Sequence, residues 1–253
     1  MANVTTRPSL FWLFSEPGRA LTELAISMPY KNRFKNEKAG DGHPVLVLPG
    51  FMSSGSSTSF LRNFISELGY DVYEWGLGRN FGKVEYIGLI VESLDEIYKK
   101  TGKQATLIGW SLGGVFARQV AKERPDLVRQ VITLGSPFAG ITEPNNVSWI
   151  YTLVSGGEKV KNTNLALLEN LPIPAGVPTT AIYSKEDGIV PWTACMEQLE
   201  DEMHQNIRVI GSHIGLGVNP CVLTIVADRL HHSKNDWKPF QPKGYIDKLI
   251  FPS

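Results

Sequence analysis

Short apolar runs alternate with amphipathic segments along most of the chain. The first clear run, Val45 to Leu48, is followed by helical spacing over residues 57–69 and by a second short run at 70–75. The alternation continues with apolar runs at 105–110, 128–137, 179–184 and 206–212, and with helical patterns at 85–102, 111–127, 192–203 and 219–231. Short runs rich in Val, Ile and Leu are typical of strands covered on both faces. The pattern therefore predicts an α/β fold with a mostly parallel sheet flanked by helices.

The alternation is interrupted once, between residues 138 and 178. This segment has no strand signal, although it includes the apolar stretches VSWIYTLVSGG and NLALLENLPIP. A loop of this length without secondary structure is uncommon inside a compact domain. We therefore expect one domain over residues 1–253, with a helical cap or lid inserted at 138–178.

The N-terminal segment has a weaker pattern. Residues 19–28 carry apolar side chains at helical spacing, whereas the stretch SLFWLF before them is closed by Ser-Glu-Pro-Gly. That stretch is too short for the hydrophobic region of a signal peptide. No run approaches the roughly 18 apolar residues of a membrane helix, so we expect no integral membrane segment. As written, the chain is expected to be cytoplasmic, or secreted if it is a mature form.

The net charge of the chain limits the classes of partner that it can attract. Lys+Arg and Asp+Glu both number 25, so the formal net charge is zero and no global field attracts nucleic acid or an anionic membrane. We expect an uncharged small-molecule or lipid-like partner.

Cys195 and Cys221 do not have the spacing of metal ligands. Two buried thiols and one disulfide both remain open, and a disulfide would imply an oxidising compartment.

One glycine-rich stretch, Gly109-Trp110-Ser111-Leu112-Gly113, lies between a predicted strand and a predicted helix. It matches G-x-S-x-G, the nucleophile elbow, in the strand–turn–helix context which that motif requires. Glycine inside an element costs about 0.5–1 kcal/mol relative to alanine, so the cluster indicates backbones too close for a Cβ. The Ser111 hydroxyl would stand at a helix N-terminus, where free N–H groups favour developing negative charge. A glycine-rich packing turn is the structural alternative.

From about Pro44 to Leu230 the chain resembles α/β-hydrolases of the serine esterase and lipase branch. The elbow at Ser111 is one of four points of resemblance. The resemblance implies the α/β-hydrolase fold, with a Ser-Asp-His triad in that chain order and a nucleophilic Ser111.

The second point is Pro49-Gly50-Phe51, which resembles the oxyanion loop of the family. His-Gly is the commoner pair there, and a proline in place of the histidine is compatible with a role for backbone N–H groups. By this resemblance the N–H groups of Phe51 and Leu112 would bond the oxygen that gains charge in the reaction. An ordinary turn is the alternative.

The third point is the stretch YSKEDGIVPW, which resembles the acid loop of the family. Asp187 follows the predicted strand 179–184 by three residues and precedes Gly and Val-Pro. A carboxylate there can hold a histidine in the required tautomer and stabilise the imidazolium. Glu186 is the rival acid, and a solvated loop acid is the structural alternative.

The fourth point is His213, directly after the last predicted strand. Of the five histidines, His43 precedes the first strand, His204 lies at a predicted helix end, and His231 and His232 end the last helix. Only His213 lies at the carboxyl edge of a strand, which is where open α/β sheets bind ligands.

The implied reaction is cleavage of a carboxylic ester through an acyl-enzyme on Ser111, with no cofactor and no metal site. Apolar side chains near the site and in the insertion would form the substrate pocket. They are Met52, Trp110, Trp149, Ile150 and Leu153. Such a pocket favours an uncharged ester, as in a carboxylesterase or lipase.

Two other functions stay open: an acyltransferase of the lipase-related branch, and a non-catalytic binding member of the fold.

The glycine-rich loop at 76–82 contains one cation, Arg79, and no following Lys-Ser/Thr. We therefore expect a structural loop near the rim of the site rather than a phosphate site.

Overall fold

The computed structural model describes residues 8–34, 40–139, 170–242 and 251. Six strands form one sheet in the order β2-β1-β3-β4-β5-β6, and each neighbouring pair is parallel. The strands are β1 (Pro44–Leu48), β2 (Asp71–Glu74), β3 (Ala105–Trp110), β4 (Val128–Leu134), β5 (Thr179–Tyr183) and β6 (His204–Arg208). The predicted parallel sheet is confirmed.

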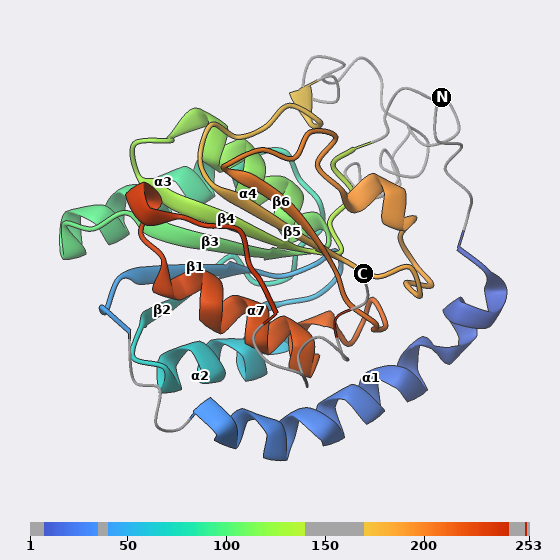
Figure 1. Cartoon of the computed structure of the whole chain (residues 1–253). Helices are drawn as coiled ribbons and strands as arrows, with labels where there is room; N and C mark the ends of the chain where they lie inside the picture. The colour runs from blue at the N-terminus through green and yellow to red at the C-terminus, as the bar shows by residue number, and fades with distance from the viewer. Residues whose placement is uncertain (1–7, 35–39, 140–169, 243–250, 252–253) are drawn as a thin grey trace.

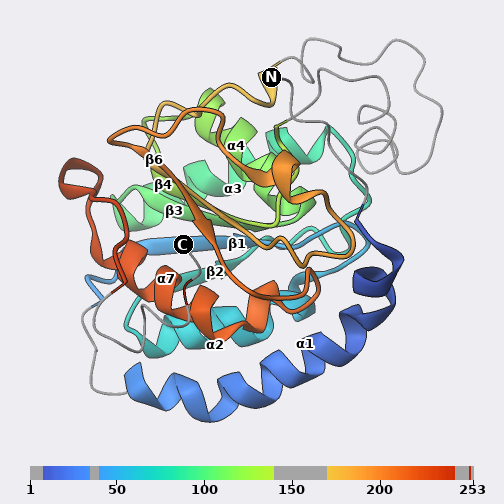
Figure 2. The same cartoon turned by 45° about the vertical axis from the view of Figure 1, so that its right-hand side comes forward.

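Helices cover both faces of the sheet (Figure 1). On one face lie α3 (Tyr86–Thr101) and α4 (Leu112–Glu123), and on the other α2 (Ser59–Glu67) and α7 (Pro220–His231). The long helix α1 (Leu10–Tyr30) runs outside α2 and α7, as both views show (Figures 1 and 2). Short 3₁₀ helices are η1 (Lys31–Phe34), η2 (Gly55–Thr58), η3 (Trp192–Cys195), η4 (Leu216–Val218) and η5 (Lys234–Asp236).

The core has two apolar layers, one on each face of the sheet. Successive side chains of a strand point to opposite faces. Val45 and Val47 of β1 accordingly belong to the layer under α2 and α7, whereas Leu46 and Leu48 belong to the layer under α3 and α4. All five residues of β1 are buried, which explains its continuous apolar run.

The strand order reverses at β1, which has β2 on one side and β3 on the other. Ligands of open α/β sheets bind at such a switch point, beyond the carboxyl ends of the strands. Phe51 follows β1 and Ser111 follows β3. The topology therefore brings the predicted oxyanion loop and the elbow to this point.

The N-terminal helix is longer than the predicted 19–28. It begins at Leu10 and continues through Pro17 and Gly18, where the sequence predicts a break. Ser9 caps it by accepting a hydrogen bond from the Trp12 N–H at 3.3 Å. Tertiary contacts of its polar side chains, described below, override the local preference for a turn.

The predicted helix over 192–203 is wrong: only the short η3 forms there. His204, predicted at a helix end, begins β6 instead. The Asp201 carboxylate accepts the N–H groups of Met203 and His204 at 2.7 and 2.9 Å. Local side-chain bonds of this kind compete with helical hydrogen bonding. Most of the predicted insertion, residues 140–169, lies outside the described residues.

The crossing of β3 and α4 leaves no room for side chains. A Cβ on Gly109 would lie 2.2 Å from the Cα of Gly114, and one on Gly113 would lie 2.4 Å from the carbonyl oxygen of Leu48. Both distances are far below van der Waals contact. The glycines therefore let β3, α4 and the end of β1 meet backbone to backbone.

Substituting Gly113 by alanine should destabilise the fold. Because the new Cβ meets rigid backbone, we expect Gly113→Ala to lower the free energy of unfolding by about 1–3 kcal/mol or more. Gly88→Ala is the matched control, since a Cβ there has nothing within 4 Å. On the exposed side of α3, it should raise stability by about 0.5–1 kcal/mol. Urea denaturation followed by circular dichroism measures both, and equal effects would contradict the close crossing.

Candidate active site

Ser111 has an unusual backbone conformation. Its φ is 53° and its ψ is −122°, and among the described residues other than glycine only Met52 also has a positive φ. Such a conformation costs about 1–3 kcal/mol and persists only where neighbouring contacts impose it. The Ser111 N–H donates to the Leu134 carbonyl at 2.8 Å, and its carbonyl accepts from Gly114 at 3.0 Å. The local geometry is that of a sharp strand-to-helix turn, as the motif predicts.

Asp187 and His213 form a buried pair at the same edge of the sheet. Asp187 Oδ2 lies 2.6 Å from His213 Nδ1. The other carboxylate oxygen, Oδ1, accepts the N–H groups of Ile189 and Val190 at 2.8 and 2.7 Å. These bonds fix the carboxylate and leave Nε2 of His213 as the ring nitrogen that can accept a proton.

A glycine in the preceding strand end makes room for this pair. Gly135 has a φ of 56°, and a Cβ on it would lie 3.1 Å from His213 Nδ1 and 3.3 Å from Asp187 Oδ2. Glu186, the rival acid in the sequence, pairs with Arg208 at 2.9 Å instead. The structure thus joins His213 to Asp187 rather than to Glu186.

The surroundings of His213 favour its protonated form. Burial alone lowers the pKa of the imidazole, but the charge and hydrogen bond of Asp187, with the charge of Glu16, outweigh burial and raise the pKa above 6.5. Glu16 lies on α1 and was not among the predicted site residues. The ring is therefore placed to take up a proton.

Trp110 connects the elbow to the loop that carries His213, residues 209–215, here called the histidine loop. Its indole Nε1 donates to the His213 carbonyl at 3.0 Å, and the two ring centroids are 6.4 Å apart. Among the described residues the Ser111 hydroxyl makes no hydrogen bond. In ligand-free sites the bond between nucleophile and base is often long and tightens only with substrate.

The predicted oxyanion loop lies directly against the elbow. A Cβ on Gly50 would lie 3.3 Å from the Cβ of Ser111. Within the described residues, the N–H of Phe51 has no acceptor, and neither has the N–H of Leu112, the first residue of α4. Two unused donors thus flank the serine.

A buried asparagine holds the oxyanion loop in place. Asn80 donates from Nδ2 to the Pro49 carbonyl at 2.9 Å, and its backbone carbonyl accepts from the Met52 N–H at 2.7 Å. Its Oδ1 accepts from the Gly82 N–H at 3.0 Å. The loop at 76–82 therefore holds the loop that follows β1. Nothing in the sequence pattern identifies Asn80 itself, whose role depends on the fold bringing two loops together.

The predicted pocket is only partly described. Met52 is 49% exposed and Trp110 is half-buried beside the site. Trp149, Ile150 and Leu153 lie outside the described residues. Over the described part of the chain, no group of three or more His, Cys, Asp or Glu side chains could hold a metal ion.

Cys195 and Cys221 are both buried and are not joined to each other as a disulfide. Burial, together with the charge of Asp187, raises the pKa of the Cys195 thiol well above its usual value. The thiol of Cys195 therefore stays protonated at neutral pH and is a poor nucleophile.

A second Asp–His pair lies at the amino ends of the strands, directly before β1. His43 contacts Asp41 through Nδ1 at 2.6 Å and Thr106 through Nε2 at 3.0 Å. Thr106 is completely buried, so this hydroxyl cannot meet a substrate. Burial and the charge of Arg129 lower the pKa of His43 to about 4 despite Asp41. This arrangement is a structural hydrogen-bond network.

The chain is similar to known esterases, lipases and thioesterases. A family model described as palmitoyl protein thioesterase matches residues 44–186. The pimeloyl-[acyl-carrier protein] methyl ester esterase of Yersinia pseudotuberculosis is 30% identical over 66 residues, which are 26% of this chain and 24% of the relative. The match thus spans about a quarter of that relative's length.

Solved structures share the fold. Lipase B of Aspergillus fumigatus has a TM-score of 0.61 and 18% identity, over 84% of this chain and 57% of that one. A structure of metagenome-derived lipolytic enzymes has a TM-score of 0.56 and 16% identity, over 75% of this chain and 92% of that one. The predicted α/β-hydrolase fold is confirmed. In the described part of the chain, no helix combines the length and apolarity needed to cross a bilayer.

The pKa values of His43 and His213, both buried, should be shifted in opposite directions. In a histidine NMR titration, His213 should titrate above 6.5 because of Asp187 and Glu16, and His43 near 4 because of burial and Arg129. Variants His213→Asn and His43→Asn assign the signals. A His213 signal that titrates below 6.5 would contradict the electrostatics of the pair.

The same shifts set the pH dependence of stability. The lowered pKa of His43 contributes stability that is present above 6.5 and is lost as pH falls toward 4. The raised pKa of His213 contributes stability that is present below 6.5 and is lost as pH rises through its folded-state value.

Proposed function

Because the chain belongs to the palmitoyl protein thioesterase family, we propose that it is a serine hydrolase that cleaves carboxylic esters through an acyl-enzyme on Ser111. The buried Asp187–His213 pair, at the sheet edge that also carries the Ser111 turn, is the observation on which the proposal rests. Ser111, Asp187 and His213 follow β3, β5 and β6 respectively, which is the chain order of the triad in α/β-hydrolases.

The proposed reaction has two halves. Nε2 of His213 takes the proton of the Ser111 hydroxyl while Oγ attacks the ester carbonyl carbon. The tetrahedral intermediate collapses, the bond to the leaving group breaks, and His213 gives its proton to the departing alcohol or thiol. Water, deprotonated by His213, then attacks the acyl-enzyme, and the carboxylic acid leaves as Ser111 recovers its proton.

The negative oxygen of each intermediate would be bonded by the N–H groups of Phe51 and Leu112. Both donors are unused among the described residues, and both belong to segments that flank Ser111. Pre-arranged donors act on charge that develops in the transition state, so they need no reorganisation during the reaction. This role of backbone groups is compatible with Pro49 at the place where relatives of the fold commonly have histidine.

An uncharged acyl group is the proposed substrate feature. Met52 is exposed on the loop whose Gly50 lies against Ser111, and Trp110 adds an apolar surface. Thioesters belong to the proposed substrate class, because the matching family is described as palmitoyl protein thioesterase. Oxygen esters of the same acyl chains react through the same acyl-enzyme.

Ser111→Ala should abolish ester cleavage. We expect the rate on p-nitrophenyl esters from acetate to palmitate, and on acyl thioesters, to fall by about 10⁴-fold or more, because the nucleophile is lost. Ser93→Ala, on α3 and remote from the sheet edge, is the matched control. Wild-type protein should also bind one serine-directed fluorophosphonate that the variant does not bind. Hydrolysis by Ser111→Ala at the wild-type rate would disprove the assignment.

Asn80→Ala should impair the oxyanion loop rather than substrate binding. Loss of the bond to the Pro49 carbonyl displaces the loop that carries Phe51, so we expect kcat to fall about tenfold to a hundredfold with little change in KM. Arg79→Ala, an exposed neighbour in the same loop, is the control. Steady-state kinetics on one ester measures both, and a change in KM alone would contradict this role.

A further inference from the structure

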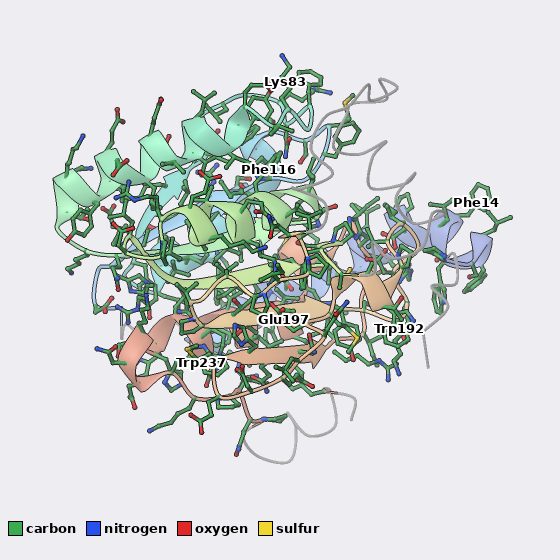
Figure 3. All side chains as sticks on the ribbon, turned by 90° about the horizontal axis from the view of Figure 1, so that it is seen from above. Phe14, Lys83, Phe116, Trp192, Glu197 and Trp237 are labelled. Atoms are coloured by element: carbon green, nitrogen blue, oxygen red, sulfur yellow. The ribbon has the colours of Figure 1, made fainter. Side chains whose placement is uncertain are left out.

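Helix α1 buries polar side chains against the domain and exposes large apolar ones, the reverse of an ordinary amphipathic helix. Its buried side chains are polar: Glu16, Glu23 and Ser27 are all 9% exposed or less. Large apolar side chains point outward, among them Phe11 at 71% and Phe14 at 80% exposed. Figure 3 shows Phe14 on α1, directed away from the rest of the fold. The buried side chains of the helix therefore contact the domain through polar groups, and Tyr30 at its end also packs against the apolar core.

The contacts of Glu16 converge on the proposed site. Its Oε1 accepts the N–H groups of Gly188 at 2.9 Å and His213 at 3.0 Å. Its Oε2 accepts the N–H of Ile214 at 2.9 Å. One carboxylate therefore binds the residue after the proposed acid and the backbone of the proposed base.

The helix also touches the acid loop directly. A Cβ on Gly188 would lie 2.4 Å from the backbone carbon of Trp12. Arg19, one turn after Glu16, pairs with Glu16 at 2.9 Å and donates to the Gly211 carbonyl at 3.2 Å. The carboxylate is thus fixed from its own helix as well as by the two loops.

We propose that Glu16 is a positioning residue of the hydrolase site: its buried carboxylate joins the acid loop to the histidine loop and sets the geometry of the Asp187–His213 pair. This inference rests on the proposed function. Glu16 acts through the backbone of other residues and touches no reacting atom, and it lies outside the part of the chain that the family model matches.

Charge gives this role a signature that a purely structural contact lacks. The charged groups that face His213 are Asp187 from the acid loop and Glu16 from α1, and Arg19 is paired with Glu16. Glu23 lies two turns further along α1 and accepts the Ser212 N–H at 2.7 Å, but it does not bond the His213 backbone. Loss of the Glu16 charge should therefore lower the pKa of His213, whereas loss of the Glu23 charge should not.

Two substitutions separate the effect of the Glu16 charge from the effect of its side-chain length. Glu16→Gln removes the charge, so the acid limb of the kcat/KM pH profile should move to lower pH, and kcat should fall by up to about a hundredfold. Glu16→Asp keeps the charge but shortens the side chain, so kcat should fall while the acid limb stays closer to that of the wild type. Glu23→Gln, the matched control on the same helix face, should lower stability without moving the acid limb.

The His213 titration by NMR is measured in the same variants, independently of ester cleavage. Glu16→Gln should lower the pKa of His213 and Glu23→Gln should leave it unchanged. Equal shifts in both variants, or none in either, would overturn the proposal. A wild type that cleaves no ester or thioester would contradict the proposed function instead. Urea denaturation of each variant shows whether it is folded under the assay conditions.

Discussion

Direct contact between the backbones of β3, α4 and the end of β1 is the constraint on which the site depends. Gly109, Gly113 and Gly114 allow this contact, and the short turn between β3 and α4 then forces Ser111 to a positive φ. The cost of that conformation, about 1–3 kcal/mol, is offset by the two apolar layers that pack the same elements together. The close approach also brings the loop after β1 against the serine. The strained backbone of Ser111 and the placement of the Phe51 N–H beside it therefore have one cause.

Comparison of the Asp41–His43 and Asp187–His213 pairs shows that a short Asp–His distance alone does not make a base. In both pairs a carboxylate oxygen lies 2.6 Å from Nδ1 of the imidazole, yet the pKa of His43 is lowered and that of His213 is raised. Burial lowers the pKa of both imidazoles and the paired carboxylate raises it in both, but the further charged neighbours differ in sign. Arg129 adds positive charge beside His43 at the amino ends of the strands, whereas Glu16 adds negative charge beside His213 at their carboxyl ends. The surroundings of His213 favour proton uptake, and those of His43 keep it neutral.

The features predicted correctly from the sequence are those encoded locally. Strand ends and turn residues place Ser111, Asp187 and His213 at one edge, because the carboxyl ends of parallel strands meet there. Asn80 could not be predicted, since its role depends on two loops that only the fold brings together. The helix expected at 192–203 fails for a different reason: its apolar and charged spacing is suitable, but local side-chain bonds of Asp201 compete with helical hydrogen bonding.

Helix α1 was the hardest element to predict, because its buried face contradicts the rule that apolar residues point inward. Glu16 and Glu23 are seven residues apart and Ser27 follows four later, so they share one face, but such a face normally meets water. Burying a carboxylate is unfavourable unless several donors bond it. The backbone N–H groups of Gly188, His213 and Ile214 meet this requirement for Glu16. Apolar packing would tolerate many orientations of a helix, whereas directional bonds to fixed N–H groups permit one. The polar face therefore gives α1 a defined register on the site, and that register ties the position of the helix to the geometry of His213.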